Sequence, residues 1–325
     1  MPAVTASAPG KIILFGEHAV VYGRPAIAAP VAQVKAQAVI RAEPRFPAGQ
    51  ILIHAPDINL HATLSDLPED HPLAKAIQSV LFELGVERAP ACNIRITSTI
   101  AVAAGMGSGA AVSVALIRAF SKFLGHPLSN ERVSAIAYEV EKLHHGAPSG
   151  IDNTVITYAR PIYYVRGQPI RFLLLPRPLH LVIADTGIAS STAAVVGEVR
   201  RRWSEEPERF ETLFDAIGDL SQAARQAIEA GHPNRLGELM NENHSLLSQV
   251  GVSCPELDAL VQTARRSGAL GAKLSGAGRG GNMVALATEP EAERIAQVLM
   301  DNGAARVLIS TVREPRSAAY TGQTG

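Results

Sequence analysis

The chain has 325 residues, which suits two domains of ordinary size or one large domain. Its 30 Lys and Arg residues balance its 30 Asp and Glu residues, and this balance argues against a nucleic-acid partner and against an anionic membrane surface, which both favour clustered positive charge. The two cysteines, Cys92 and Cys254, are too few for a disulfide framework or a cysteine-rich zinc site. We find no signal-peptide pattern and no apolar run long enough to span a bilayer, so the sequence predicts a cytoplasmic protein.

The first half of the chain alternates strand and helix patterns. Interleaved polar and apolar residues predict strands, and apolar residues along one helical face predict helices. The predicted strands are 33–42, 50–54 and 92–99, followed by two short strands at 154–159 and 161–167. Helices are predicted at 72–85, from the glycine cluster at 105–109 to Gly125, and after Ser129, which is a suitable N-cap.

The second half opens with a strand pattern at 179–186 and continues with helices over 208–267, where Pro255 suits the first turn of a helix. The end of the chain predicts strands at 272–278, 282–288 and 305–312 and a helix at 289–302. Thr288 and Glu291 have the spacing of a capping box for that helix. The Pro-rich segment LLLPRPLH lies between the halves, so we predict domains at 1–178 and 179–325.

The segment AAGMGSGAA (103–111) lies between a predicted strand and a predicted helix. Free backbone N–H groups and the dipole at a helix N-terminus attract anions, and glycines let a phosphate approach the backbone. The segment lacks the Lys-Ser/Thr pair of a Walker A loop. We interpret it as a phosphate-binding turn, with a tight turn that binds nothing as the alternative.

A second glycine-rich segment, GAGRGG (276–281), matches the G-x-G-x-x-G pattern of dinucleotide-binding folds. That pattern requires a helix after the glycines, whereas 282–288 predicts a strand. A turn that closes over a ligand therefore fits better.

Charged residues flank an apolar strand pattern in SAPGKIILFGEHAVVYG (7–23). Lys11 follows a Pro-Gly turn, and Glu17 and His18 follow the strand and a glycine. These residues either face one cleft from the two ends of the strand or lie at the solvated ends of an edge strand.

The segment EKLHHGAPSGIDN (141–153) concentrates acids, histidines and a serine. Glu141 and His145 lie four residues apart on one predicted helical face, but no further spaced His or Cys completes a metal site. Ser149, His145 and Asp152 could form a nucleophilic triad, although the G-x-S-x-G elbow is absent. Asp152 could also accept a proton from a hydroxyl or cap a helix, and these alternatives stay open on this segment alone.

Four segments in this order resemble the GHMP kinase superfamily, and within it the mevalonate kinase branch is the most similar. They are PGKIILFGEHAVVYG (9–23), GMGSGAA (105–111), EKLHHGAPSGIDN (141–153) and KLSGAGRGGNMVAL (273–286). The resemblance implies an α+β fold, with an N-terminal domain similar to ribosomal protein S5 domain 2, a ferredoxin-like C-terminal domain and the site in the cleft between them. It also implies phosphorylation of the 5-hydroxyl of (R)-mevalonate with ATP and Mg²⁺, and a homodimer is expected.

The resemblance implies a role for individual residues. Asp152 would accept the hydroxyl proton, and Lys11 would keep Asp152 ionised. Glu141, together with Ser108, would hold Mg²⁺. The residues that would wrap the ATP phosphates are Gly105, Met106, Gly107, Ser108, Gly109 and Ala110. The residues that would contact or enclose the substrate are Glu17, His18, His145, Gly276, Ala277 and Gly278.

Two positions depart from the family pattern. Gly109 stands where the family has a second serine that supplies an oxygen to the metal, so Ser108 or water would have to serve instead. Arg279 replaces a residue that is commonly glycine, and its guanidinium suits an added phosphate contact. A kinase for phosphomevalonate or homoserine, and a non-catalytic nucleotide-binding protein, are the alternative interpretations.

Overall fold

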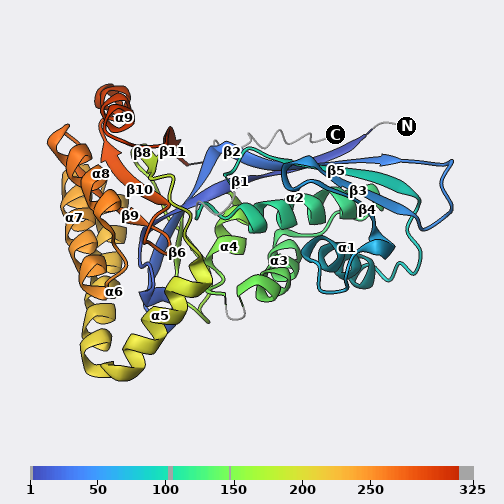
Figure 1. Ribbon diagram of the computed structural model, residues 1–325, viewed down its shortest axis with the longest axis horizontal. Coiled ribbons are helices and arrows are strands. Elements are labelled where there is room, and N and C mark those ends of the chain that lie inside the picture. Colours follow the sequence, from blue (N-terminus) through green and yellow to red (C-terminus); the bar gives the residue numbers. More distant parts are fainter. Residues whose placement is uncertain (1–2, 102–104, 146–147, 315–325) are drawn as a thin grey trace, which may run out of the picture.

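The computed structural model describes residues 3–101, 105–145 and 148–314, without the side chains of residues 144 and 145. Over these residues the chain forms two parts side by side, each built on one β-sheet (Figure 1). The N-terminal part has a seven-stranded sheet and the C-terminal part a four-stranded sheet. The predicted α+β organisation in two parts is confirmed. The boundary between 178 and 179 falls in the connection between the two sheets and stays a prediction.

The N-terminal sheet has the order β4-β3-β5-β2-β6-β7, and β1 pairs with β2 off this path. Its one parallel pair among the described residues is β3 with β5. The strands are β1 (Val4–Phe15), β2 (Ala26–Ala42), β3 (Ile51–Ala55), β4 (Leu60–Thr63), β5 (Cys92–Ser98), β6 (Ile162–Tyr164) and β7 (Arg171–Phe172). The strands predicted at 50–54, 92–99 and 161–167 are confirmed within a few residues, whereas the one predicted at 33–42 is the second part of β2, which begins earlier, at Ala26.

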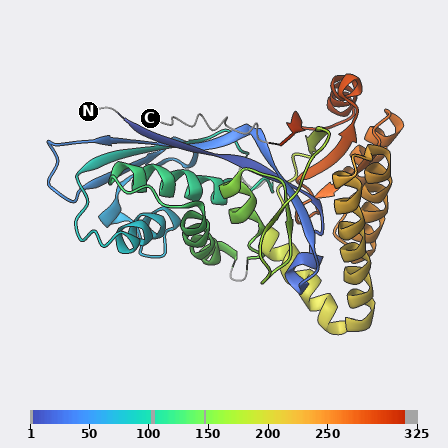
Figure 2. The ribbon, with the colours of Figure 1, turned by 180° about the vertical axis from the view of Figure 1, so that it is seen from behind.

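The strand β1 changes character along its length. Residues 4–7 alternate between partly buried and exposed, whereas residues 10–15 are all buried. β1 contacts α2 and α4 of its own part and α6, α7 and β9 of the C-terminal part, toward which it runs (Figure 2). The contact with β9 lies near the end of β1, where Ser275 hydrogen-bonds to Ile13. The apolar segment IILF suits a strand buried on both faces.

Helices cover one face of the N-terminal sheet (Figure 1). They are α1 (Pro72–Glu83), α2 (Ser108–Phe123), α3 (Asn130–His145) and α4 (Ile151–Tyr158). The short 3-10 helices of this part are η1 (Ala19–Tyr22), η2 (Pro56–Ile58) and η3 (Leu64–Asp66). As predicted, Ser129 caps α3, since its hydroxyl accepts the backbone N–H of Arg132 at 3.4 Å.

The strand predicted at 154–159 is wrong, because this segment belongs to α4. Thr154, Val155 and Ile156 favour strands by propensity. However, Gly150, with φ of 88°, precedes a helix in which the Thr154 hydroxyl donates back to the Gly150 carbonyl at 2.7 Å. The side chains are buried among α2, α3 and β1, so tertiary packing outweighs the local preference.

The C-terminal sheet is antiparallel, in the order β11-β8-β10-β9. The strands are β8 (Leu179–Asp185), β9 (Gly271–Ser275), β10 (Asn282–Ala287) and β11 (Arg306–Val312). The helices are α5 (Thr192–Glu205), α6 (Pro207–Glu229), α7 (Pro233–Val250), α8 (Pro255–Arg266) and α9 (Ala292–Asp301), with η4 (Glu289–Glu291) before α9. Pro255 lies in the first turn of α8 as predicted, and α5 begins earlier than the helical region expected from 208.

The capping box predicted from Thr288 and Glu291 is wrong. The Thr288 side chain caps nothing, and the backbone N–H of Glu291 donates instead to the Thr288 carbonyl at 3.2 Å. This bond closes the 3-10 turn η4, so α9 starts only at Ala292. None of the helices in the described part of the chain is long and apolar enough to cross a membrane.

Candidate active site

Lys11 and Asp152 form an ion pair where β1 meets α4. The Nζ of Lys11 lies 3.0 Å from Oδ1 of Asp152. The Lys11 side chain is 6% exposed and the Asp152 side chain 27%, so the carboxylate is the member that a ligand can reach. Asp152 lies in the first turn of α4, whereas the N-cap is Gly150, so the N-cap interpretation of Asp152 is wrong.

Glu141 adds a second carboxylate to this pair. It is buried near the end of α3 and accepts the backbone N–H of Asn153. Burial raises the pKa of Glu141 to about 8, the charge of Asp152 acts in the same direction, and Lys11 and the Asn153 N–H oppose the shift. A cation placed beside Glu141 would offset both the burial and the repulsion.

The first glycine-rich turn lies against Lys11. The Lys11 backbone N–H donates to the Met106 carbonyl at 3.0 Å. A Cβ added at Gly107 would lie 2.8 Å from Cδ1 of Ile156 and 3.0 Å from Cγ of Lys11. Gly107 also has φ of 73°, which glycine adopts at little cost. The turn therefore requires glycine at 107 in order to lie directly over the lysine.

The N-terminus of α2 adjoins this turn. Gly107 is the N-cap, Ser108 is the first helical residue, and no side chain of the described residues caps the helix. The free N–H groups of the first turn can therefore bind an anion. A Cβ added at Gly105 or Gly109 would meet no atom of the described residues within 4 Å. Ala110 is buried in the first turn of α2.

His18 lies on the other side, in the turn after β1. Its Nε2 lies 2.9 Å from the Ala277 carbonyl, and since a carbonyl only accepts, Nε2 carries the hydrogen. Burial lowers the pKa of His18 to about 4; the bond to Ala277 opposes this shift and the charge of Arg279 adds to it. The imidazole is therefore neutral near pH 7, and its Nδ1 is left as a hydrogen-bond acceptor.

Glu17 has a different environment from the one expected of a substrate contact. Its side chain is fully buried, in an ion pair with Lys273 of β9. Its second oxygen accepts a hydrogen bond from Nδ2 of Asn243 in α7, with 3.3 Å between the two atoms. Because both carboxylate oxygens have protein partners, the expectation that Glu17 contacts a substrate directly is corrected to a supporting position beside His18.

The two glycine-rich segments face each other. An added Cβ at Gly276 would lie 3.9 Å from the Gly105 carbonyl oxygen. Ala277 accepts the His18 hydrogen bond, and a Cβ at Gly278 would lie 1.9 Å from the Val252 carbonyl oxygen. Residues 276–278 therefore lie between the first glycine turn and His18, as expected of a cleft wall.

Arg279 does not point to a phosphate site. Its guanidinium pairs with both carboxylate oxygens of Glu198 in α5 and also donates to the Gly251 carbonyl. The interpretation of Arg279 as an added phosphate contact is wrong, because the side chain joins α5 to the end of α7.

Of the two histidines in the segment 141–153, the structure describes the backbone. The backbone of His145 ends α3, but its side chain lies outside the described residues. Ser149 holds the next turn instead of pairing with Asp152: its hydroxyl accepts the Ile151 N–H at 3.3 Å, and its carbonyl accepts the Tyr164 hydroxyl at 2.8 Å.

Three residues of the interior were missed from the sequence: Lys273, Ser275 and Asn243. Lys273 and Ser275 lie in the segment KLSGAG, which we interpreted only through its glycines. A lysine within a short buried strand was a usable signal, because a buried charge needs an opposite charge nearby. The identity of its partner had no local signal.

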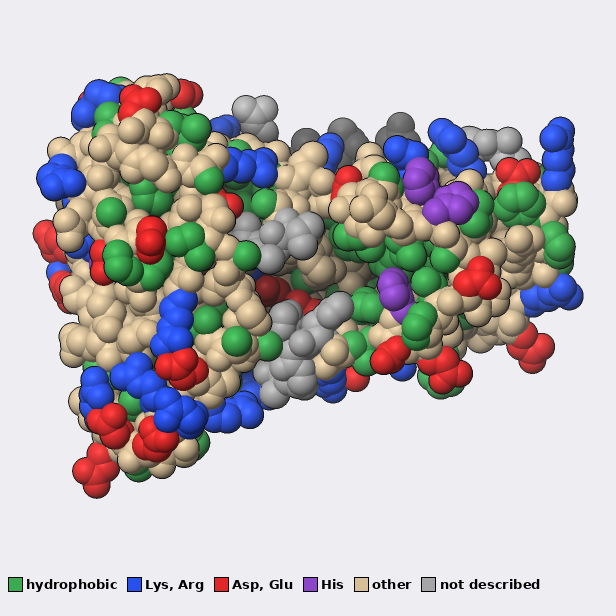
Figure 3. Space-filling view, in the orientation of Figure 1, with side chains coloured by type: hydrophobic (Ala, Val, Ile, Leu, Met, Phe, Trp, Pro, Cys, Tyr) green, Lys and Arg blue, Asp and Glu red, His purple; other side chains and the backbone are tan. Residues whose placement is uncertain are grey.

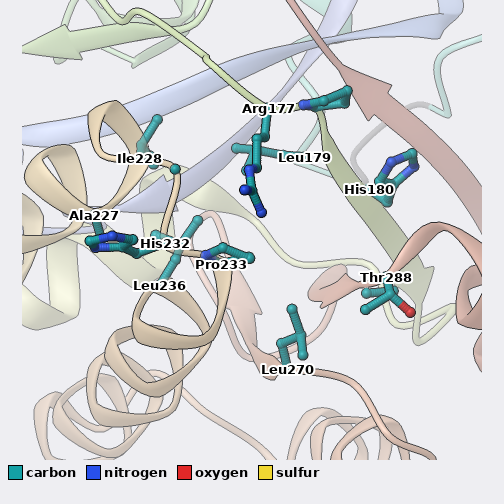
Figure 4. Close-up of a pocket in the computed structure, with 13 residues that line it drawn as sticks. Arg177, Leu179, His180, Ala227, Ile228, His232, Pro233, Leu236, Leu270 and Thr288 are labelled. Carbon is teal, nitrogen blue, oxygen red and sulfur yellow. The ribbon is translucent and has the colours of Figure 1, made fainter.

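The space between the two parts forms a hollow with acidic side chains at its floor (Figure 3). A separate cavity of about 110 Å³ lies in the C-terminal part (Figure 4). Arg177, His180 and His232 border it together with apolar side chains, and none of the predicted site residues does. The chemistry is therefore concentrated between the two parts.

Comparisons with known proteins agree with this geometry. The family model described as the GHMP kinases N terminal domain matches residues 72–160, and the model described as GHMP kinases C terminal matches residues 224–305. A mevalonate kinase of Pyrococcus horikoshii is 42% identical over 87% of this chain and 88% of its own length.

Two solved structures are similar over nearly the whole chain. The structure of L. major mevalonate kinase in complex with R-mevalonate has a TM-score of 0.81 and 35% identity, and covers 96% of each chain. The Methanococcus jannaschii mevalonate kinase has a TM-score of 0.82 and 26% identity, over 97% of this chain and 99% of that one.

Proposed function

The chain belongs to the GHMP kinase family, and we propose that it is a mevalonate kinase, which transfers the γ-phosphoryl group of ATP to the 5-hydroxyl of (R)-mevalonate in the synthesis of isoprenoid precursors. The observation that carries the proposal is the Lys11–Asp152 pair at 3.0 Å directly beneath the glycine-rich turn of α2. Phosphoryl transfer needs mainly positioning and charge neutralisation, and this arrangement offers both.

Asp152 is the group that orients the attacking hydroxyl and takes its proton. Its carboxylate is partly exposed, whereas the neighbouring Lys11 ammonium is buried. Lys11 neutralises the charge of Asp152 and stabilises negative charge that develops on the transferred group. Since the transition state is loose, the proton can move late, when the hydroxyl oxygen has become more acidic.

The nucleotide phosphates occupy the N-terminus of α2. The free backbone N–H groups of Ser108, Gly109 and Ala110 would donate hydrogen bonds to a phosphate oxygen. No described atom lies within 4 Å of a Cβ at Gly105 or Gly109, so a phosphate can come close to the backbone there. Gly107 and Met106 bring the same turn against Lys11. The γ-phosphoryl group and the acceptor hydroxyl would thus meet near Asp152.

Mg²⁺ would be held by Glu141 with the hydroxyl of Ser108, and it would neutralise phosphate charge. No group of three His, Cys, Asp or Glu side chains suited to a metal occurs among the described residues. Mg²⁺ commonly takes one or two carboxylates and completes its shell with phosphates and water. The buried Glu141, with its pKa raised to about 8 beside Asp152, is a carboxylate that a cation would stabilise.

The acceptor lies on the side of His18. The neutral imidazole presents Nδ1 as an acceptor for a substrate hydroxyl, and Gly276 to Gly278 enclose the same space. That His145 also contacts the substrate stays a prediction. The homodimer and the cytoplasmic location also stay predictions.

The test is product identification by ³¹P NMR after incubation of the purified protein with ATP, Mg²⁺ and (R)-mevalonate. The proposal predicts one new phosphate monoester for each ADP formed. Nucleotide binding without consumption of ATP, with mevalonate and with every other alcohol offered, would instead support a non-catalytic nucleotide-binding protein.

A further inference from the structure

Every second residue from Lys273 to Ala277 contacts the end of β1 or the turn after it. Lys273 pairs with Glu17. The Ser275 hydroxyl donates to the Ile13 carbonyl at 2.8 Å and accepts the Ile13 N–H at 3.2 Å. Side chains of a strand alternate between its faces, so Lys273 and Ser275 project from one face of β9 toward the N-terminal part. The Ala277 carbonyl, two residues further, accepts from His18.

The pair formed by Glu17 and Lys273 is completely removed from solvent, since both side chains are 0% exposed. Each charge therefore depends on the other for neutralisation, and Asn243 supplies a further hydrogen bond to Glu17. Such a pair contributes little net stability compared with apolar residues of similar volume. It does, however, tie the backbone at Glu17 to one position relative to β9.

His18 follows Glu17 directly in a turn of unusual backbone conformation. His18 has φ of 61°, which non-glycine residues adopt only where the surroundings impose it. Gly16 has φ of 91°, and a Cβ there would lie 2.5 Å from Cα of Ala26. The contacts of Glu17 on one side and of the His18 ring with Ala277 on the other hold this turn.

We propose that Lys273 is a positioning residue of the acceptor site, which acts through the Glu17 carboxylate to set the place and tautomer of the His18 imidazole. The proposal rests on the proposed function, because it assigns His18 to the phosphoryl acceptor. The acceptor side of the cleft is therefore completed by the C-terminal part, while Lys11, Glu141 and Asp152 belong to the N-terminal part.

A second attachment keeps the rest of this segment on the C-terminal part. The ring of Tyr22 stacks on Phe214 of α6 with centroids 4.2 Å apart, and Trp203 of α5 lies 5.3 Å from Tyr22. Arg24 donates to Asp215 at 2.9 Å and pairs with Glu211. The loss of the Glu17–Lys273 pair would therefore release the turn at 17–18 and leave residues 19–24 docked.

The test uses Lys273→Met, Glu17→Gln and the variant with both changes. Each single change strands one buried polar or charged group and can impair folding, whereas the double change removes both charges and keeps similar volumes, so it is expected to fold. In the double variant the KM for mevalonate is expected to rise about tenfold or more, with the KM for ATP within about twofold of the wild type. Ile295→Ala, on the buried face of α9, is the matched control: it is expected to lower Tm and to leave both KM values unchanged.

Two spectroscopic measurements separate positioning from general loosening. The protein has a single tryptophan, Trp203, and its unchanged emission in the double variant would show that the segment stays docked on α5 and α6. The ¹⁵N signals of the His18 imidazole, assigned by their loss in His18→Gln, are expected to show the Nε2–H tautomer in the wild type and mixed tautomers in the double variant.

A folded double variant with wild-type KM for mevalonate, or with an unchanged His18 tautomer, would overturn the positioning role. Equal increases in the KM for mevalonate and for ATP would overturn it as well. Wild-type protein that does not phosphorylate mevalonate would refute the proposed function alone, because the His18 signals and the KM for the alcohol that is turned over still test Lys273.

Discussion

The Nζ atom of Lys11 lies 3.0 Å from Oδ1 of Asp152, and the two side chains come from β1 and from the first turn of α4. The lysine is buried under the glycine-rich turn, which contacts it through Met106 and Gly107. One cation therefore touches both the loop that would bind phosphate and the carboxylate that would orient the hydroxyl. This connection is the basis of the predictions below.

Asp152→Asn should lower kcat by about two orders of magnitude or more, the range found for loss of a general base. The amide keeps the size of the side chain but accepts no proton, and it also leaves Lys11 without its anionic partner. ATP affinity should change little, since the α2 turn is intact. Steady-state kinetics with nucleotide titration measure both quantities. Asp219→Asn, at an exposed position of α6, is the control, and near-normal turnover of Asp152→Asn would mean that this residue only orients its neighbours.

Gly105 and Gly107 provide a matched pair for the loop, because both have φ of 73°. Alanine at either position carries a backbone cost of about 1 to 2 kcal/mol. Only at 107 does the new Cβ also collide, with Ile156 and with the stem of Lys11. Gly107→Ala should therefore raise the KM for ATP and reduce kcat well beyond Gly105→Ala at similar Tm. Equal effects of the two variants would contradict the close packing of the turn on Lys11.

Gly109→Ser tests how the metal shell is completed. A Cβ at 109 would meet no atom of the described residues within 4 Å, and a hydroxyl at the start of α2 would offer a hard oxygen ligand. We expect the Mg²⁺ concentration for half-maximal activity to fall several-fold. Gly109→Ala also raises the helix propensity, by more than serine does, but adds no hydroxyl, and should leave that concentration unchanged. If both variants respond alike, the hydroxyl does not bind the metal.

In the protein without bound metal and nucleotide, Glu141 should lower the free energy of unfolding as the pH rises. Its pKa is about 8 in the folded protein against an ordinary value of 4.5, so between these values the folded state holds a proton that the unfolded state has released. The free energy of unfolding then falls as the pH rises through this range. Urea unfolding with a chelator present should find Glu141→Gln more stable than the wild type at pH 8, with a smaller difference at pH 5. A variant that is less stable at pH 8 would contradict the assigned shift.

Local signals predicted the glycine-rich turn before α2 and the apolar end of β1. Glycines at 105, 107 and 109 mark the junction of an apolar strand and a helix; Gly105 and Gly107 have positive φ, and Gly107 also meets a steric requirement. The Pro-Gly turn expected before Lys11 is wrong, because Pro9 and Gly10 lie within β1, at a register shift in its pairing with β2; Lys11 itself lies where β1 passes beneath the glycine-rich turn. These features depend on neighbours in the chain, so a local pattern is sufficient to predict them.

Other features depend on contacts between distant segments. Glu17 resembles a free acid at a strand end, and its burial against Lys273 and Asn243 requires the docking of the two parts. From the sequence, Arg279 resembles a phosphate ligand, but in the structure it pairs with Glu198 of α5. The segment TVITYA has strand propensity and is helical because helices and β1 enclose it. No pattern within these segments encodes the partner.

The most direct test of the proposed function is the comparison of kcat/KM for (R)-mevalonate, phosphomevalonate and homoserine, measured with the same protein, ATP and Mg²⁺. The proposed function predicts that mevalonate is preferred by at least about a hundredfold, since a site built to hydrogen-bond one substrate rejects an analogue that leaves its buried polar groups, such as His18, unpaired. Turnover of phosphomevalonate or homoserine with a higher kcat/KM than that of mevalonate would contradict it.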